Sequence, residues 1–243
     1  MLPPPLSGEF VSDDWLASVL GVPSFRWDAA ELEEDSEPVI PAGFISVKLD
    51  PAGPAAPRTV ELLQLSGFRL VTVEVTFEGT VHGKTDVAAP GLHAAIRTAE
   101  PSDAPSVQRI ASESFRTDRF HRDRLIPMAL ADRLKGEWAT NFFLARRGTH
   151  MYVWDDGAIR GFLLLIREGP RLIIDLVATD AESRGRGIAR RLIERAVADL
   201  SPNSLLLRVG TQIDNAASIR LYSSLGLSLV ESRLVLHRTP VMP

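Results

Sequence analysis

The chain has 243 residues, of which 45% are hydrophobic and 24% are charged, so it can bury a sizeable core and is neither disordered nor fibrous. It has no cysteine, which excludes disulfides, thiolate metal sites and a cysteine nucleophile, and its formal net charge of -4 argues against a nucleic-acid-binding protein. No apolar run approaches the roughly 18 residues of a membrane span, and the N-terminus lacks the pattern of a signal peptide, so we expect a soluble cytoplasmic protein.

The N-terminal third of the chain has the pattern of a small α/β domain. Asp13 can cap a short helix that ends at Gly21, and a second short helix is predicted to end at Gly67. Apolar and polar residues then alternate over 71–78, which predicts a half-buried strand. The polar stretch 79–91 predicts a linker. The predicted domains are therefore 1–90, a small N-terminal α/β domain, and 91–243.

The remaining residues follow the order β-α-α-β-β-β-α-β-α-β, which predicts a mixed sheet flanked by helices. Ser102 and Pro127 are expected to begin the first two helices. Leu172–Thr179 is a nearly unbroken apolar run, which is typical of a strand buried on both faces. The other expected elements are strands over 92–97, 151–154, 159–166, 205–211 and 227–237, and helices over 189–200 and 215–225.

A glycine-rich loop, Arg184-Gly185-Arg186-Gly187, lies between the apolar strand and an amphipathic helix. Its glycines let backbone N–H groups point into one cavity, and the helix N-terminus and the arginines add positive charge, which suits a pyrophosphate. A dinucleotide-binding fingerprint would need a third glycine where Arg190 stands, and a P-loop would need a Gly-Lys-Ser/Thr sequence that the chain lacks. An ordinary turn is the alternative.

Two segments carry a family resemblance. Residues 177–189 resemble the acyl-CoA motif of the GNAT superfamily of N-acetyltransferases, and residues 211–227 resemble its Asn-x-x-Ala-x-x-Leu-Tyr-x-x-Leu-Gly-Phe segment, with Leu227 in place of the usual Phe. The resemblance implies an α/β fold with a mixed, mostly antiparallel sheet, in which two central parallel strands splay apart around acetyl-CoA. These strands would be 172–179 and 204–211.

The resemblance also implies how acetyl-CoA, the expected co-substrate, is bound. Backbone groups at the end of the apolar strand would pair with the pantetheine arm, and amides of the glycine-rich loop would hold the pyrophosphate. The residues implied to bind acetyl-CoA are Val177, Ala178, Thr179, Arg184, Gly185, Arg186, Gly187, Ile188, Ala189, Asn215 and Tyr222.

Two residues are predicted to be catalytic. In the family's geometry Tyr222 would stand beside the thioester sulfur and protonate the departing thiolate, because a phenol is a weak acid; a core tyrosine is the alternative. Asp175 is the only charge inside the apolar strand, a costly position unless it is paired, so it is a candidate base or substrate anchor. A structural partner for an arginine is the other interpretation of Asp175, and Asn215 can simply cap its helix.

A polar and aromatic stretch over 114–127 is expected to line the acceptor pocket, as this region does in the superfamily. Together with the residues that follow, it resembles a narrower group, the N-acetyltransferases of nucleotide-linked amino-deoxysugars of the dTDP-fucosamine type, although Asp123-Arg124 stands where that group commonly has Asp-Pro. The bland alternatives are solvated arginines, a core tryptophan and a hydrogen-bonded loop histidine. The predicted acceptor-binding residues are Arg119, His121, Trp138 and Asn141.

The combined interpretation is an acetyl-CoA-dependent N-acetyltransferase that acts on a primary amine of a nucleotide-linked amino-deoxysugar, by direct attack in a ternary complex. The alternatives are a protein, peptide or other small-amine acetyltransferase, and a non-catalytic acyl-CoA-binding module. The expected partners are the small-molecule acceptor and, in a homodimer, a second copy of the chain. Neither nucleic acid, nor a membrane, nor a metal is expected, because no spacing of His, Asp and Glu suits a metal site.

Overall fold

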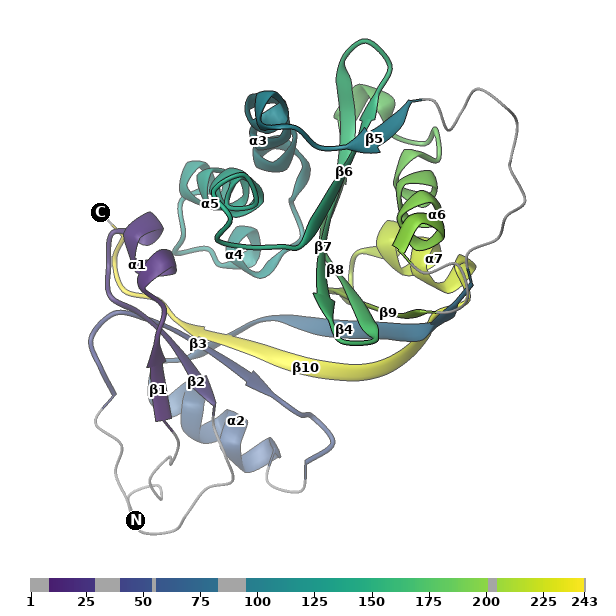
Figure 1. The fold of residues 1–243 in the computed structure, drawn as a ribbon. Helices are drawn as coiled ribbons and strands as arrows, with labels where there is room; N and C mark the ends of the chain where they lie inside the picture. Colours follow the sequence, from purple (N-terminus) through teal and green to yellow (C-terminus); the bar gives the residue numbers. More distant parts are fainter. Residues whose placement is uncertain (1–8, 29–39, 54–55, 83–94, 201–204, 243) are drawn as a thin grey trace.

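The computed structural model describes residues 9–28, 40–53, 56–82, 95–200 and 205–242 (Figure 1). Their strands form one 10-stranded sheet in the order β1-β2-β3-β10-β4-β9-β8-β7-β6-β5. The strands are β1 (Glu9–Ser12), β2 (Ser24–Asp28), β3 (Phe44–Leu49), β4 (Arg69–Val81), β5 (Ile96–Thr98), β6 (His150–Asp155), β7 (Ile159–Glu168), β8 (Arg171–Thr179), β9 (Leu205–Gln212) and β10 (Ser228–Arg238). The helices are α1 (Asp14–Leu20), α2 (Ala56–Leu65), α3 (Ala104–Ser114), α4 (Arg119–Arg122), α5 (Met128–Thr140), α6 (Ile188–Leu200) and α7 (Ala216–Ser224).

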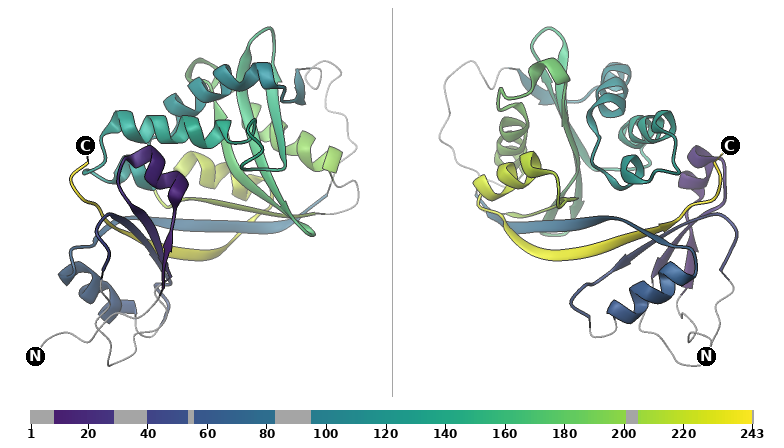
Figure 2. Two further views of the ribbon diagram at one scale, coloured as in Figure 1. Left: turned by 60° about the vertical axis from the view of Figure 1, so that its left-hand side comes forward. Right: turned by 180° about the vertical axis from the view of Figure 1, so that it is seen from behind.

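The sheet is mixed and mostly antiparallel, which confirms the predicted fold class. Only β2 with β3 and β8 with β9 run parallel among the paired strands of the described residues. Helices α3, α4 and α5 lie on one side of β6, β7 and β8, and α6 and α7 lie on the other (Figures 1 and 2). None of the helices in the described ranges is both long and apolar enough to cross a membrane.

The two central parallel strands pair only along their first halves. The β8–β9 register runs from Arg171 opposite Leu206 to Ile174 opposite Val209, and β8 then continues to Thr179 without β9. The register of β7 against β8 shifts at the same place, where Asp175 is an extra residue, and such a bulge bends the strand and ends a pairing. The structure therefore contains the splay that the family resemblance implied.

The bulge also changes which side of the sheet the apolar side chains of β8 reach. Leu172 and Ile174 pack in the cluster with α6, whereas Leu176 and Ala178 pack in the cluster with α3 and α5. Strand β8 therefore has buried side chains on both faces of the sheet, as the apolar run predicted, although the alternate residues are only partly buried. The side chain of Asp175 is only 7% exposed, so its charge is costly unless partners lie beside it.

Several predicted helix boundaries are confirmed and one is wrong. Asp13 caps α1 through the Leu16 amide, and Pro127 precedes α5. Ser102 does not cap a helix, because it lies in a 3-10 turn over Pro101–Asp103 and α3 begins only at Ala104. The start of the strand predicted over 92–97 lies outside the described residues.

The N-terminal elements join the same sheet and the same core as the rest of the chain. Strand β4 lies between β10 and β9, and β3 pairs with β10 on its other side. Leu16 and Val19 of α1 and Phe44 of β3 share a buried cluster with Phe120 and with α5. The boundary proposed near residue 90 falls in 83–94, outside the described residues, and the division into two domains stays a prediction.

Candidate active site

The glycine-rich loop adopts the open conformation that anion binding requires. Gly185 has a φ of 77° and Gly187 a φ of 75°, values that side-chain-bearing residues rarely adopt. A Cβ at either glycine would meet no atom within 4 Å, so the space in front of the loop is free. Because Ile188 begins α6, the amides of its first turn face the loop with the positive end of the helix.

Two arginines, one in the glycine-rich loop and one in the first turn of α6, have exposed partners. Arg186 pairs with Asp156 of the β6–β7 turn at 3.6 Å, and its side chain is 54% exposed. Arg190 donates to Ser224 and pairs with Glu194 at 3.3 Å. Exposed pairs of this kind contribute only about 0–1 kcal/mol, so an incoming phosphate can take over the arginine at little cost.

The end of β8 offers a backbone edge next to this loop. Val177, Ala178 and Thr179 pair with β7 but have left β9, so their far edge has no strand beside it. An extended ligand can pair with such an edge in the manner of an added strand. The structure thus brings the three residues predicted for the pantetheine arm to the edge that the splay opens.

Asn215 and Tyr222 come from the same helix, α7. The Asn215 side chain accepts from the Ser218 amide at 3.2 Å and donates to Thr211 Oγ1 at 3.1 Å, so it does cap the helix. Tyr222 is 3% exposed and its ring lies 6.1 Å from that of Phe77. Burial raises the pKa of Tyr222 to about 12, with a partly opposing hydrogen bond from Ser218, so the phenol holds its proton.

Asp175 has partners on its own side of the sheet. Arg147 donates to both carboxylate oxygens, Nε to Oδ2 and Nη2 to Oδ1, each at 2.6 Å, and Trp138 Nε1 donates to Oδ2 at 3.0 Å. This is the contact expected of a structural partner for an arginine. Its role as a base or substrate anchor stays a prediction, and Arg147 is a neighbour that sequence patterns did not single out.

His121 lies inside a chain of charged side chains. Its ring is fully buried, with Nδ1 on Asp118 and Nε2 on Asp132 Oδ1 at 3.0 Å, and Arg116 in turn binds Asp132. Burial disfavours the charged ring, but the two carboxylates outweigh it and raise the pKa of His121. The arrangement is that of the hydrogen-bonded loop histidine, and any contact with an acceptor would have to follow a movement of the ring.

Two of the other predicted acceptor residues, Trp138 and Arg119, lie near a buried lysine. The Lys135 ammonium is 4.8 Å from the centroid of Trp138 and 5.0 Å from that of Phe115, and burial lowers its pKa. Arg119 lies 4.5 Å over the ring of Phe120 and donates to Ser46 Oγ of β3. Asn141 is buried at the C-terminal end of α5. Lys135 comes directly after Leu134 but is not part of the apolar stripe of α5, so periodicity alone did not predict that it is buried.

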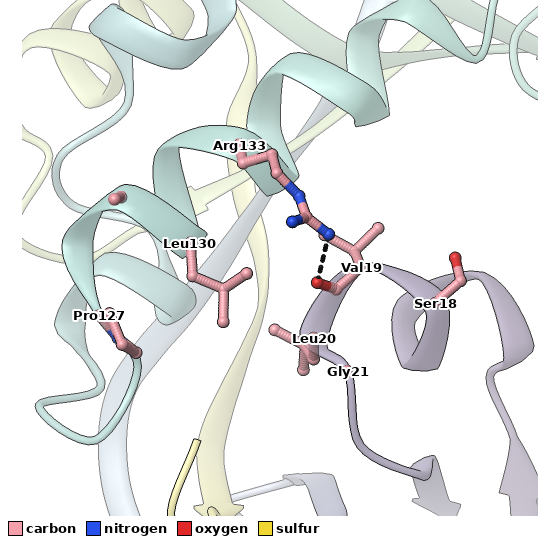
Figure 3. Close-up of a pocket in the computed structure, with 8 residues that line it drawn as sticks. Ser18, Val19, Leu20, Gly21, Pro127, Leu130 and Arg133 are labelled. Carbon is pink, nitrogen blue, oxygen red and sulfur yellow. Dashed lines mark hydrogen bonds between the residues drawn. The ribbon is translucent and has the colours of Figure 1, made fainter. Parts of the chain in front are cut away.

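A groove of about 440 Å³ separates α1 from α5, and Arg133 crosses it to donate to the Val19 carbonyl at 2.7 Å (Figure 3). No residue of the glycine-rich loop lines it, so it belongs to the junction between the N-terminal helix and the acceptor-side helix. The groove is lined by Ser18, Val19, Leu20, Gly21, Pro127, Ala129, Leu130 and Arg133.

Within the described residues, no cluster of three or more His, Asp or Glu side chains is placed to hold a metal ion.

Two curated proteins are similar to this chain in sequence. The dTDP-fucosamine acetyltransferase of Escherichia coli O6:H1 is 31% identical over 195 residues, which cover 76% of this chain and 79% of that protein. The spore coat polysaccharide biosynthesis protein SpsD of Bacillus subtilis is 25% identical over 142 residues. This match covers 58% of the present chain and only 49% of SpsD.

A solved structure shows the same fold over nearly the whole chain. It is a functionally unknown conserved protein from Staphylococcus epidermidis, with a TM-score of 0.59 at 11% identity over 96% of this chain and 94% of that one. Residues 105–227, half of the chain, match the model of the acetyltransferase (GNAT) family. On the strength of that match and of the splayed strands that end at the glycine-rich loop, the chain belongs to the GNAT family of acetyltransferases.

Proposed function

We propose that the protein transfers the acetyl group of acetyl-CoA to a primary amine of a nucleotide-linked amino-deoxysugar, by direct attack in a ternary complex. Acetyl-CoA is the co-substrate that the family implies. The observation that carries the proposal is the splay of β8 from β9 after Ile174, which ends at the open glycine-rich loop. The sugar acceptor is suggested by the Escherichia coli relative at 31% identity.

The described residues fit acetyl-CoA along its length. Amides at Gly185 and Gly187 would hold the pyrophosphate together with Arg184 and Arg186, whose side chains are solvent-accessible. The free edge of β8 would pair with the pantetheine arm, which places the thioester between the two splayed strands. Asn215 fixes the start of α7, the helix from which Tyr222 would reach the thioester sulfur.

The proposed reaction assigns one role to Tyr222, next to the thioester, and another to Asp175, on the acceptor side. The acceptor amine attacks the thioester carbonyl, and the C–S bond breaks as the tetrahedral intermediate collapses. Tyr222 would give its proton to the sulfur, while the proton lost by the amine passes to solvent or to a base. Asp175 is the predicted base or anchor, and with both oxygens bonded to Arg147 it would act by orienting Trp138 or the acceptor.

A side chain at Gly187 should weaken acetyl-CoA binding. It would project into the free space in front of the loop, and the carboxylate of Gly187→Glu would also repel the pyrophosphate. We expect the Kd for acetyl-CoA, measured by calorimetry, to rise about tenfold or more, which corresponds to about 1.4 kcal/mol. Gly169→Glu is the matched control, because Gly169 also has a positive φ and an open Cβ position but lies in the β7–β8 turn. Unchanged affinity in folded Gly187→Glu would remove the assignment of this loop.

Arg119 should serve the acceptor and not acetyl-CoA. No carboxylate lies within 4.0 Å of its guanidinium among the described residues, so donors remain for an acceptor phosphate after the bond to Ser46. Arg119→Ala is expected to raise the acceptor KM about tenfold and to leave the acetyl-CoA KM nearly unchanged. Arg124→Ala, an exposed arginine of the same segment, is the control. If neither constant moves, the diphosphate-sugar acceptor loses its physical basis.

The whole proposal is tested by turnover. Purified protein with acetyl-CoA is offered nucleotide-linked amino-deoxysugars, free amino sugars, a lysine peptide and a polyamine, and release of the CoA thiol is followed. Thiol release with a nucleotide-linked amino sugar supports the proposal. Thiol release only with the peptide or the polyamine contradicts the proposed class of acceptor. Binding of acetyl-CoA without turnover of any amine would favour a non-catalytic acyl-CoA-binding module.

A further inference from the structure

The surface of Trp138 is already occupied by other groups. The guanidinium carbon of Arg147 is 4.5 Å from its ring centroid, the Lys135 ammonium is 4.8 Å from it, and its N–H donates to Asp175. Two cations and a carboxylate leave little of this ring for a ligand. Trp138 therefore suits the role of a rigid support, and another side chain must offer the flat apolar surface of the acceptor site.

Trp15 of α1 is the aromatic side chain next to this support. It meets Trp138 edge to face, with 5.6 Å between ring centroids and 84° between ring planes. Its ring is half-buried, and in the described part of the chain no cation lies over it. Because Trp15 makes this one aromatic contact among the residues that the structure describes and is only half-buried, part of its ring surface stays exposed for stacking. One helical turn farther, Ser18 and Val19 line the α1–α5 groove (Figure 3).

The N-terminal elements also contact Arg119, the residue proposed to bind the phosphate of the acceptor. Ser46 of β3 accepts from the Arg119 guanidinium, and the charge of Asp13, the residue that caps α1, acts on the same group. Phe44 packs against Phe120, with 6.2 Å between the ring centroids. The N-terminal segment thus contacts Arg119 through Ser46 and contacts Trp138 through Trp15, so it reaches two of the predicted acceptor residues.

We infer that the N-terminal segment forms one wall of the acceptor site and that Trp15 stacks on the base of the nucleotide-linked acceptor, at the Trp15 end of the α1–α5 groove. The inference rests on the proposed function. A diphosphate at Arg119 and a base on Trp15 would recognise the nucleotide part of the acceptor, and the amino sugar would extend from it toward the splay of β8 and β9. The segment is then part of the specificity machinery and not only of the fold.

The test compares two acceptors, a nucleotide-linked amino sugar that the enzyme turns over and the same amino sugar without its nucleotide. Trp15→Ala should raise the KM of the nucleotide-linked acceptor about tenfold, the size of one lost stacking contact. The KM of acetyl-CoA and the rate with the free amino sugar should not change. Trp15→Tyr, which keeps an aromatic face, should retain most of the affinity.

Phe10→Ala is the matched control, because Phe10 is another half-buried N-terminal aromatic residue and stacks on Trp27 at 4.7 Å. An equal KM increase for both acceptors, or none in folded Trp15→Ala, would show that Trp15 only packs and would overturn the inference. If Trp15→Ala does not fold, Trp15→Leu decides, since it keeps bulk without a stacking face. No turnover of any nucleotide-linked amino sugar by the unmodified enzyme would refute the proposed function itself and the inference with it.

Discussion

Replacing Tyr222 by Phe is expected to lower kcat by about a hundredfold to ten-thousandfold, the usual loss for one positioned acid. The pKa of about 12 means that the phenol stays protonated at neutral pH and is ready to donate. The same desolvation raises the proton affinity of a thiolate formed beside it, so the difference in pKa between the phenol and the thiol does not widen and the thiolate can accept the proton as the C–S bond breaks. Because the hydroxyl acts in the transition state, the loss should appear in kcat with little change in acetyl-CoA affinity.

The chain provides its own control for this substitution. Tyr152 is the only other tyrosine, it is also buried, and burial likewise raises its pKa to about 12, but it lies on β6 and its hydroxyl interacts with Asp199. Tyr152→Phe should therefore leave kcat unchanged. Should Tyr222→Phe keep most of its turnover, solvent protonates the thiolate and Tyr222 has only a packing role.

The free energy of unfolding is expected to fall by about 3 kcal/mol as the pH is lowered from about 6.5 to about 4, because of His237. Burial lowers the pKa of His237 to about 4, and its hydrogen bond to Asp123 at 3.0 Å only partly opposes this. Within the described ranges its Nε2 has no hydrogen-bond partner, and the ring lies among Phe44 and Phe120, so a second ring proton would be unsatisfied.

The sign follows from which state binds the proton first. With the pKa of His237 near 4 in the folded state and near 6.5 in the unfolded state, acid protonates the unfolded chain first and destabilises the fold across that window. His121 acts in the opposite direction: its raised pKa gives stability that is complete below about 6.5 and is lost as the pH rises through the folded pKa. Asp123, whose pKa is lowered, loses its contribution only at still lower pH.

Urea unfolding at a series of pH values measures this dependence. His237→Asn keeps a donor for Asp123 and removes the titrating ring, so its stability should be much flatter between pH 6.5 and 4. His150→Asn is the comparison, because burial and Arg167 also lower the pKa of His150 but its position on β6 is only half-buried, so this variant should flatten the slope less. The same acid slope in His237→Asn and in the parent protein would show that other groups cause the acid sensitivity.

The sequence predicted what depends on local patterns. The open loop at Gly185 and Gly187 and the cap at Asn215 were both found, because each depends on residue types within a few positions of one another. The partners of Asp175 were not predicted. Arg147 is 28 residues away in sequence and comes close to Asp175 only because β6, β7 and β8 fold into one sheet. The same holds for Lys135, whose burial depends on Phe115 and Trp138 closing over it.

The position of β10 between β3 and β4 has a consequence for how the chain reaches this fold. Its contacts join residues as far apart as Ile45 and Arg238, and proteins rich in such distant pairings have a high contact order and fold slowly. Until β10 arrives, β3 lacks a strand on that side and β4 leaves one edge open, and open edges invite pairing with other chains. We therefore expect the docking of β10, which joins the N-terminal segment to the rest of the enzyme, to be a late and slow step of folding.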